Sequence, residues 1–201
     1  TRDNTVQDYN NVAGSYGPKS SDVRHRFVNV YSYSVPTLPF VKSYALGRQA
    51  LGGWSFQGIL GWRSGLPIDV TAGRELLGSG RSDANRPDYV AGQAPYLKDT
   101  NALTWLNPAA FDANTPATQK RFGTLGYNAY RGPSGFTYDA ALHKTFALTE
   151  RQRLNFRFEM FNALNHKVLS NPVSNRSNAN FGRIQGASGG RNIQFALKYI
   201  F

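Results

Sequence analysis

The chain has 201 residues, a formal net charge of +11, and 40% hydrophobic and 13% aromatic residues. This length allows a single domain with a sizeable core, and the apolar content excludes a disordered protein. The sequence has no cysteine, which excludes disulfides and thiolate metal sites, and it has no apolar run of the roughly eighteen residues that a membrane-spanning helix needs.

The basic residues are scattered along the sequence and never form a block of five like charges. We therefore expect no nucleic-acid partner, because cations that face anionic lipid or a polar lumen explain the excess equally well. The chain begins at Thr1 rather than Met, and we interpret it as a fragment or a processed product.

Residues 1–24 are predicted to be the end of an extracellular loop, and the first strand is predicted at 25–35. Side chains of this strand alternate with a period of two, which indicates a strand with one apolar face. Asn29 is the exception on that face. The apolar members are Phe27, Tyr31, Tyr33 and Val35.

The second predicted strand, 54–64, carries Trp54 and Trp62 on one face. At a rise of roughly 3.3 Å per residue and a tilt near 40°, these residues are separated by about 20 Å along a barrel axis. This spacing sets one indole near each edge of an apolar band, as in an aromatic girdle. Two tryptophans on a core strand of a soluble sandwich give the same pattern, so that alternative stays open.

Two further strands are predicted at 138–148 and 151–161, and they are joined by a tight turn. Their polar faces are predicted to point into a barrel, where the side chains either contact a plug or line a substrate path. We prefer contact with a plug. The residues concerned are Asp139, His143, Arg153, Asn155, Arg157 and Glu159.

The last predicted strand, 191–201, ends on the final aromatic residue of the chain. Its alternate apolar side chains are Ile193, Phe195, Leu197, Tyr199 and Phe201. Each of the five predicted strands is about ten residues long, which is the length that a tilted strand needs to cross a bilayer.

The connections between these strands are unequal. The links 36–53 and 148–151 are short or moderate, whereas 65–136 and 162–190 are long. In an antiparallel arrangement the long links fall on one rim, which is typical of an outer-membrane barrel with extracellular loops and a periplasmic C-terminus. Five strands cannot close a barrel, and open edges are unfavourable in lipid, so we expect the missing strands to precede Thr1.

Loop 65–136 contains a dense set of aromatic residues that either stack on a ligand or form a small core for the loop. The residues proposed for ligand contact are Tyr89, Tyr96, Trp105, Phe111, Tyr127 and Tyr130.

No motif in the sequence predicts an enzyme, a catalytic residue or a metal site. Ser188 fits G-x-S-x-G, but the motif lacks the strand before it and the helix after it that a nucleophile elbow needs. The three histidines have no metal-ligand spacing. Asp83, Asn85 and Asp88 offer oxygen ligands for Ca²⁺ in an extracellular loop, although a turn fixed by local hydrogen bonds is the preferred interpretation.

An ordered succession of longer motifs resembles the C-terminal barrel portion of TonB-dependent outer-membrane receptors, of the Oar-like type with an N-terminal carboxypeptidase-regulatory-like domain. The resemblance covers nearly the whole chain from Asp22. It is carried by "DVRHRFVNVYSYSVP", "LGGWSFQGILGWRSGLPIDV", "NRPDYV", "WLNPAAF", "FGTLGYNAYRGPSGFTYDAALHKTF", "RLNFRFEMFNALNHKVLSNP", "NFGRI" and "GGRNIQFALKYIF".

The resemblance implies an antiparallel all-β transmembrane barrel of 22 strands, closed by an N-terminal plug, that imports a ligand with energy from the TonB complex. It implies contacts with the lipid bilayer and lipopolysaccharide, with the protein's own plug and remaining strands, and with the barrel assembly machinery. The machinery would recognise Phe201 and the apolar residues that alternate before it. A sugar, a peptide and a siderophore are all compatible ligands.

Two alternative functions remain at this stage. The first is an outer-membrane surface protein with a structural or adhesive role and no transport. The second is a soluble β-sandwich binding module.

Overall fold

The computed structural model describes residues 6–37, 45–77 and 84–201. The chain divides into two compact units. The sheet unit consists of His25–Arg63, Gly135–Val168 and Ser188–Phe201, and the loop unit consists of Thr1–Arg24, Ser64–Ser134 and Leu169–Ala187. Both units are built from antiparallel strand pairs with a few short helical turns.

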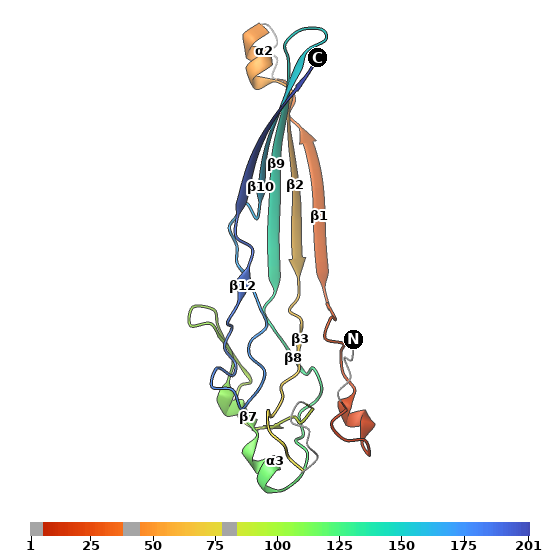
Figure 1. Ribbon diagram of the computed structural model, residues 1–201, viewed down its shortest axis with the longest axis vertical. Coiled ribbons are helices and arrows are strands. Elements are labelled where there is room, and N and C mark those ends of the chain that lie inside the picture. Colours follow the sequence, from red (N-terminus) through yellow and green to blue (C-terminus); the bar gives the residue numbers. More distant parts are fainter. Residues whose placement is uncertain (1–5, 38–44, 78–83) are drawn as a thin grey trace. The chain divides into compact units, whose positions relative to one another are not determined.

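Five long strands form the sheet unit, and every pairing in it is antiparallel. The order across the sheet is β1-β2-β9-β10-β13, as Figure 1 shows. The strands are β1 (Arg26–Ser34), β2 (Trp54–Arg63), β9 (Gly135–Ala147), β10 (Arg153–Phe161) and β13 (Asn192–Ile200).

The observed strands overlap the five alternating segments of the sequence, and β9 differs most at its start. The alternation predicts a start at 138, whereas β9 begins at Gly135. Gly135 pairs with Arg63 of β2, and Phe136 pairs with Trp62. The extension therefore comes from pairing with a distant strand, and periodicity within 135–137 carries no signal for it.

The register places alternate residues of all five strands on two opposite faces, because successive side chains of a strand point to opposite sides. We call these the apolar face and the polar face. The apolar face includes Trp62 and Phe136 in one row, and the polar face includes His143 and Arg157 in another.

The link between β1 and β2 contains one short helix, α2 (Ala45–Leu51). Side chains attach this link to the sheet, because Gln49 Nε2 donates to the Ala147 carbonyl at 2.8 Å and Trp54 Nε1 donates to the Ala50 carbonyl at 3.0 Å. Among the described residues, no helix has the length and apolarity needed to cross a membrane.

The loop unit contains short strand pairs rather than one sheet. Its pairs are β3 (Pro67–Ile68) with β8 (Tyr130–Arg131), β4 (Asp88–Tyr89) with β7 (Phe111–Asp112), and β5 (Tyr96–Asp99) with β6 (Thr104–Leu106). The helical turns are η1 (Val12–Ser15), η2 (Pro108–Ala110) and α3 (Asn114–Thr118). The strands β11 (Val168–Leu169) and β12 (Ala187–Ser188) form one more pair.

A hydrophobic core holds the loop unit together. Its buried members are Ile68, Val70, Leu106, Ala110, Phe111, Leu125 and Phe181. The members come from segments far apart in the sequence, so this core stabilises chain that would otherwise be two long irregular connections.

Tight packing of backbone against backbone in the loop unit requires glycine at position 123. A Cβ atom on Gly123 would lie 2.0 Å from the Arg86 carbonyl oxygen and 2.6 Å from the Pro87 carbonyl carbon. On Gly126 the nearest atom would be the Ala129 Cβ at 3.8 Å, which is ordinary contact.

We expect Gly123→Ala to destabilise the loop unit by about 1–3 kcal/mol, the usual range for overpacking, because backbone cannot move aside as a side chain can. Gly126→Ala is the matched control and should change the stability by about 1 kcal/mol or less. Hydrogen exchange of loop-unit amides in the full-length protein measures both effects. Equal protection in the two variants would contradict the role of Gly123.

Candidate functional site

The polar face brings together three of the side chains that the sequence predicts to face a barrel interior. Arg157 Nη2 donates to Glu159 Oε1 at 2.6 Å, and His143 Nε2 lies 3.7 Å from the same oxygen. The charged hydrogen bond between Arg157 and Glu159 therefore adds to the strand pairing that brings the three side chains together.

The other predicted polar side chains lie on the same face but make separate contacts. Thr145 Oγ1 donates to Asn155 Oδ1 at 2.9 Å, and Asp139 Oδ1 accepts a bond from the Asn162 backbone N–H at 2.8 Å. Arg153 begins β10, opposite Ala147 and Ile200 in the register. Their exposure to a barrel interior stays a prediction.

The polar face also carries cations that are absent from the predicted set. Arg26 and Arg63 lie directly opposite one another on β1 and β2, and Lys198 of β13 lies opposite Asn155 of β10. Cations therefore outnumber carboxylates on this face, and a charged row of this kind requires water or a polar partner against it.

The apolar face of the sheet unit leaves large side chains uncovered. Phe27 is 54% exposed, Tyr33 57%, Phe195 72% and Leu197 67%. A soluble sandwich packs a second sheet against such a face and buries it. A strand of nine residues, such as β13, spans about 30 Å, and about 23 Å along the barrel axis at a 40° tilt, which matches the apolar band of a membrane barrel.

The proposed girdle tryptophans lie on this apolar face. Trp62 is 38% exposed. Trp54 contacts Phe156 of β10 edge-on, with ring centroids 6.1 Å apart. The two indoles lie at opposite ends of β2, which is the arrangement that a girdle needs, and their depth in lipid stays a prediction.

Lys144 is an exception on the apolar face that the alternation of the sequence conceals. By the alternation of β9 it lies on the same face as Leu142 and Phe146, yet it is only 3% exposed. Its ammonium donates to the Gly52 carbonyl and lies 5.0 Å from the centroid of the Trp54 ring and 4.9 Å from that of Phe146. Aromatic faces and a carbonyl thus shield the charge.

The two outer strands of the sheet each have one partner among the described residues. β1 pairs with β2, and β13 pairs with β10. All nine residues of β13 are exposed, including the predicted assembly residues up to Tyr199, and Phe201 after the strand is 93% exposed. Both outer edges carry backbone groups that further strands would satisfy.

Most of the aromatic residues proposed for ligand contact pack into the loop unit. Phe111 is 1% exposed and Tyr127 7%, and Tyr96, Trp105 and Tyr130 pack against the core. The rings of Tyr96, Tyr130 and Phe111 form an edge-to-face series, with centroids 5.6 Å and 5.2 Å apart. Tyr89 is the exposed member of the set, at 43%.

A buried arginine connects the N-terminal segment to the rest of the loop unit. Arg86 is 1% exposed. Its Nε donates to the Leu125 carbonyl at 2.9 Å, and its Nη2 donates to the Gly14 carbonyl and to Ser15 Oγ, each at 3.1 Å. Burial lowers the pKa of the guanidinium and raises the pKa of the nearby Asp69 carboxyl, and each partly offsets the shift of the other.

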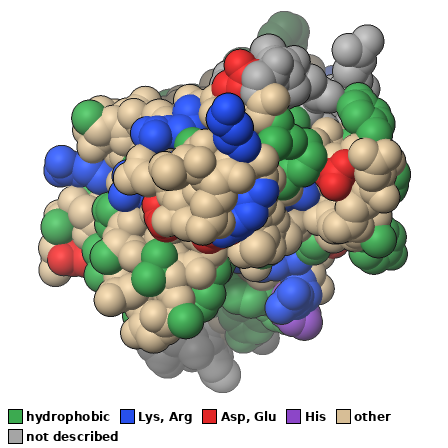
Figure 2. Space-filling model, turned by 90° about the horizontal axis from the view of Figure 1, so that it is seen from below, with side chains coloured by type: hydrophobic (Ala, Val, Ile, Leu, Met, Phe, Trp, Pro, Cys, Tyr) green, Lys and Arg blue, Asp and Glu red, His purple; other side chains and the backbone are tan. Residues whose placement is uncertain are grey.

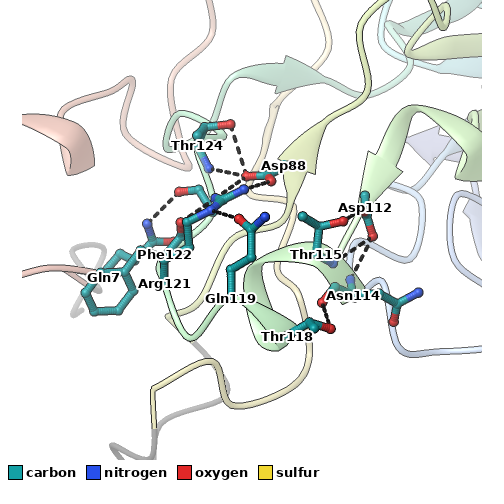
Figure 3. A network of polar contacts seen from close by, with 11 residues as sticks. Gln7, Asp88, Asp112, Asn114, Thr115, Thr118, Gln119, Arg121, Phe122 and Thr124 are labelled. Atoms are coloured by element: carbon teal, nitrogen blue, oxygen red, sulfur yellow. Dashed lines mark hydrogen bonds and ion pairs between the residues drawn. The ribbon is translucent and has the colours of Figure 1, made fainter.

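A second polar network surrounds Asp88 (Figure 3). Its two carboxylate oxygens accept bonds from Arg121 at 3.0 and 2.5 Å, and Oδ1 also accepts from the Thr124 backbone N–H at 2.9 Å. The bonds from Arg121 hold the pKa of Asp88 below its usual value. Asp112, the last residue of β7, lies in the same view, and its pKa is lowered chiefly by the hydroxyl of Thr115.

These contacts bear on the proposed Ca²⁺ ligands. Asp83 lies outside the described residues. Asn85 is 2% exposed and its Nδ2 donates to the Arg74 carbonyl at 3.1 Å, while Asp88 is paired with Arg121. In the described part of the chain, no three His, Asp or Glu side chains are grouped closely enough to hold a metal ion.

Ser188, the serine of the Gly-rich motif, is the last residue of β12 and is exposed.

Figure 2 shows the surface of the loop unit from the side on which α3 and β7 lie. Lys and Arg side chains (blue) are dispersed there among polar surface, in agreement with the scattered basic residues of the sequence.

A sheet with one exposed apolar face, one charged face and two edges open to further strands defines the wall of a membrane β-barrel. The chain belongs to the family described as outer membrane beta barrel domain, whose model matches residues 1–194. This membership places the protein in the outer membrane. No curated protein and no solved structure matches the chain.

We expect Arg86→Met to destabilise the loop unit by about 3–5 kcal/mol, because it removes one partner of a buried charged network and leaves the carbonyls of Gly14 and Leu125 without donors. Arg74→Met is the control, since Arg74 is exposed and donates to Asn114 Oδ1. Hydrogen exchange around residues 14–16 and 124–126 reports the loss. Similar protection in both variants would contradict this account.

Acid should weaken the Asp88 network. A carboxylate with a lowered folded pKa contributes stability above its unfolded pKa of about 4 and loses it as the pH falls through the folded value. Asp88→Asn should therefore flatten the fall in thermal stability as the pH drops below about 4. Asp69→Asn should act with the opposite sign and in another pH range, because burial raises the pKa of Asp69 and its carboxyl lowers stability as the pH rises above about 4. Melting curves of the two variants from acidic to neutral pH test both signs.

Proposed function

We propose that the chain forms the last five strands of a TonB-dependent outer-membrane receptor of the Oar-like type, which takes up a ligand with energy from the TonB complex. The observation that carries the proposal is the two-faced sheet. Its apolar face suits lipid, its charged face suits a filled interior, and its open edges suit pairing with further strands of the same barrel.

The charged face supports a large, filled barrel rather than a narrow one. Small barrels fill their interior with their own side chains, whereas barrels of 22 strands hold a plug in the lumen. Arg26, Arg63 and Lys198 are long cations on the polar face, and a polar plug surface is the contact that would neutralise them. The number of 22 strands rests on the resemblance of the sequence.

The connections support the proposed orientation. The link between β9 and β10 is a tight turn in which the Leu148 and Thr149 backbone N–H groups donate to the Gln152 carbonyl at 2.9 and 3.2 Å. The long links from β2 to β9 and from β10 to β13 contain the loop unit except for its first segment, Thr1–Arg24. Short turns are periplasmic in outer-membrane barrels and long loops are extracellular, so we place the loop unit outside and the C-terminus in the periplasm.

This function implies several partners. They are the lipid bilayer and lipopolysaccharide, the protein's own plug and remaining strands, the TonB complex, and the assembly machinery, which would recognise Phe201 and the alternating residues before it. The protein is proposed not to be an enzyme and to bind no nucleic acid. Sugars, peptides and siderophores remain the candidate ligand classes.

A surface protein without transport is the second candidate, and the core of the loop unit favours it. Aromatic residues that pack against this core, such as Tyr96 and Trp105, stabilise the loops and offer little area to a ligand. A stable extracellular unit serves adhesion as well as it serves uptake. The soluble sandwich is disfavoured by the uncovered apolar face.

Capture of TonB from living cells distinguishes transport from adhesion. An affinity tag is inserted at Gly92, an exposed turn position with open space around it, in the full-length protein in its native cells. After formaldehyde cross-linking, we expect the purified protein to carry TonB, and a porin tagged in the same way to carry none. A tagged protein that reaches the outer membrane without capturing TonB would overturn the transport proposal.

A further inference from the structure

Asn162 is a buried asparagine that directly follows β10, at the end of the ladder between β10 and β13. The ladder ends where Phe161 pairs with Asn192. Asn162 has a backbone φ of +50° and is 6% exposed. A left-handed backbone is uncommon outside glycine, and asparagine tolerates it better than most residues do. The position therefore combines an unusual backbone with a buried polar side chain.

The side-chain amide of Asn162 joins two segments that are far apart in the sequence. Its Nδ2 donates to the His166 carbonyl at 3.0 Å and to the Gly189 carbonyl, 27 positions away, and its Oδ1 accepts from the His166 backbone N–H at 3.0 Å. The Asn162 backbone N–H donates to Asp139 Oδ1 of β9 at 2.8 Å. One residue thus connects β9, the turn after β10 and the segment before β13.

A second asparagine of the same turn extends this arrangement. Asn165 also has a left-handed backbone, with a φ of +51°, and its N–H donates to the Asn162 carbonyl at 2.8 Å. Its Oδ1 accepts from the Arg191 backbone N–H at 3.3 Å. We call Asn162, Asn165 and Gly189 the clamp, because their contacts hold together the two ends of the link between β10 and β13.

Gly189 suits this contact because it has no side chain. Its φ is +94°, a conformation that residues with a Cβ atom rarely adopt. A Cβ on Gly189 would also lie 3.3 Å from Asn162 Nδ2 and 3.3 Å from the His166 carbonyl oxygen, which is tighter than ordinary contact. A Cβ on Gly190 would meet no atom within 4 Å, so the next position offers a matched comparison.

The clamp closes the link between β10 and β13 at its base. Beyond the clamp, the link contributes Phe181 to the core of the loop unit. Closing a long loop costs conformational entropy, and bonds at its two ends offset that cost whether or not the residues between them are ordered. The alignment of β10 with β13 then depends on the clamp and on the ladder, and not on packing around Phe181.

We propose that the clamp fixes the register of β13 against β10 independently of the structure of residues 167–188. Among the described residues β13 pairs with β10 alone, and a shift by one residue would exchange its two faces. Asn162 is the positioning residue, and the carboxylate of Asp139 supports Asn162 through one oxygen. The proposal rests on contacts within the sheet unit and holds whether or not the protein transports a ligand.

Hydrogen exchange of the full-length protein in outer-membrane vesicles tests this independence. Phe181→Ala removes a buried ring from the core of the loop unit and should speed exchange of amides 169–187 at least about tenfold. With the clamp intact, amides 158–161 and 192–195 of the ladder should keep their exchange rates within about twofold. Faster exchange of these ladder amides in Phe181→Ala would overturn the proposal, because β13 would then depend on the loop core.

Removal of the Asn162 side chain tests the clamp itself. Asn162→Gly keeps the left-handed backbone without strain and deletes only the amide. Because three hydrogen bonds are lost, exchange of the same ladder amides should rise at least about tenfold. Adding Phe181→Ala to Asn162→Gly should now raise it further. Unchanged ladder exchange in Asn162→Gly, or no added effect of Phe181→Ala in that background, would contradict the proposal.

Two glycine variants form a milder pair that disturbs the clamp without removing its asparagine. Gly189→Ala should speed exchange of the ladder amides, because the new Cβ crowds the amide of Asn162. Gly190→Ala should leave their exchange unchanged, because its Cβ points into open space. Equal ladder exchange in the two variants would also count against the clamp.

Discussion

Backbone hydrogen bonding in hydrocarbon is the constraint on which the sheet unit depends. Within a bilayer each N–H and C=O group has to find a partner in protein, because lipid tails offer none. The antiparallel ladders supply these partners for β2, β9 and β10 on both sides, and for β1 and β13 on one side. The same ladders fix the register, and the register assigns each side chain to lipid or to the interior.

Because the five strands share one register, a shift in their pairing changes the face on which several side chains lie. Arg157, Glu159 and His143 meet on the polar face only because β9 and β10 pair in this register. A slip by one residue would carry all of them to the lipid side. On the opposite face the same pairing shields Lys144 between aromatic rings, so a charge that violates the alternation is still tolerated.

Much of the sheet was predictable because period-two patterning is a local signal. Strand positions, the antiparallel all-β class and the division into two faces follow from residues such as Leu154, Phe156 and Phe158, which alternate without interruption. The loop unit was not predictable in this way. Arg86 bonds to Gly14, Ser15 and Leu125, which are 39 to 72 positions away, and no window of sequence contains that pairing. Lys144 was missed for the same reason, since its shielding comes from Gly52 and Trp54.

The segments of the loop unit are synthesised at different times, because they are dispersed along the chain. It takes residues from Thr1–Arg24, Ser64–Ser134 and Leu169–Ala187, and strands of the sheet separate these segments in the sequence. Contacts between distant segments form slowly, because closing the long stretch of chain between them reduces its conformational entropy before any stabilising contact has formed. The last segment follows β10 and precedes β13, so the core around Phe181 is completed only after β1, β2, β9 and β10 have been synthesised. Until then the earlier segments expose apolar surface, and that interval is when the protein is most open to misfolding and proteolysis.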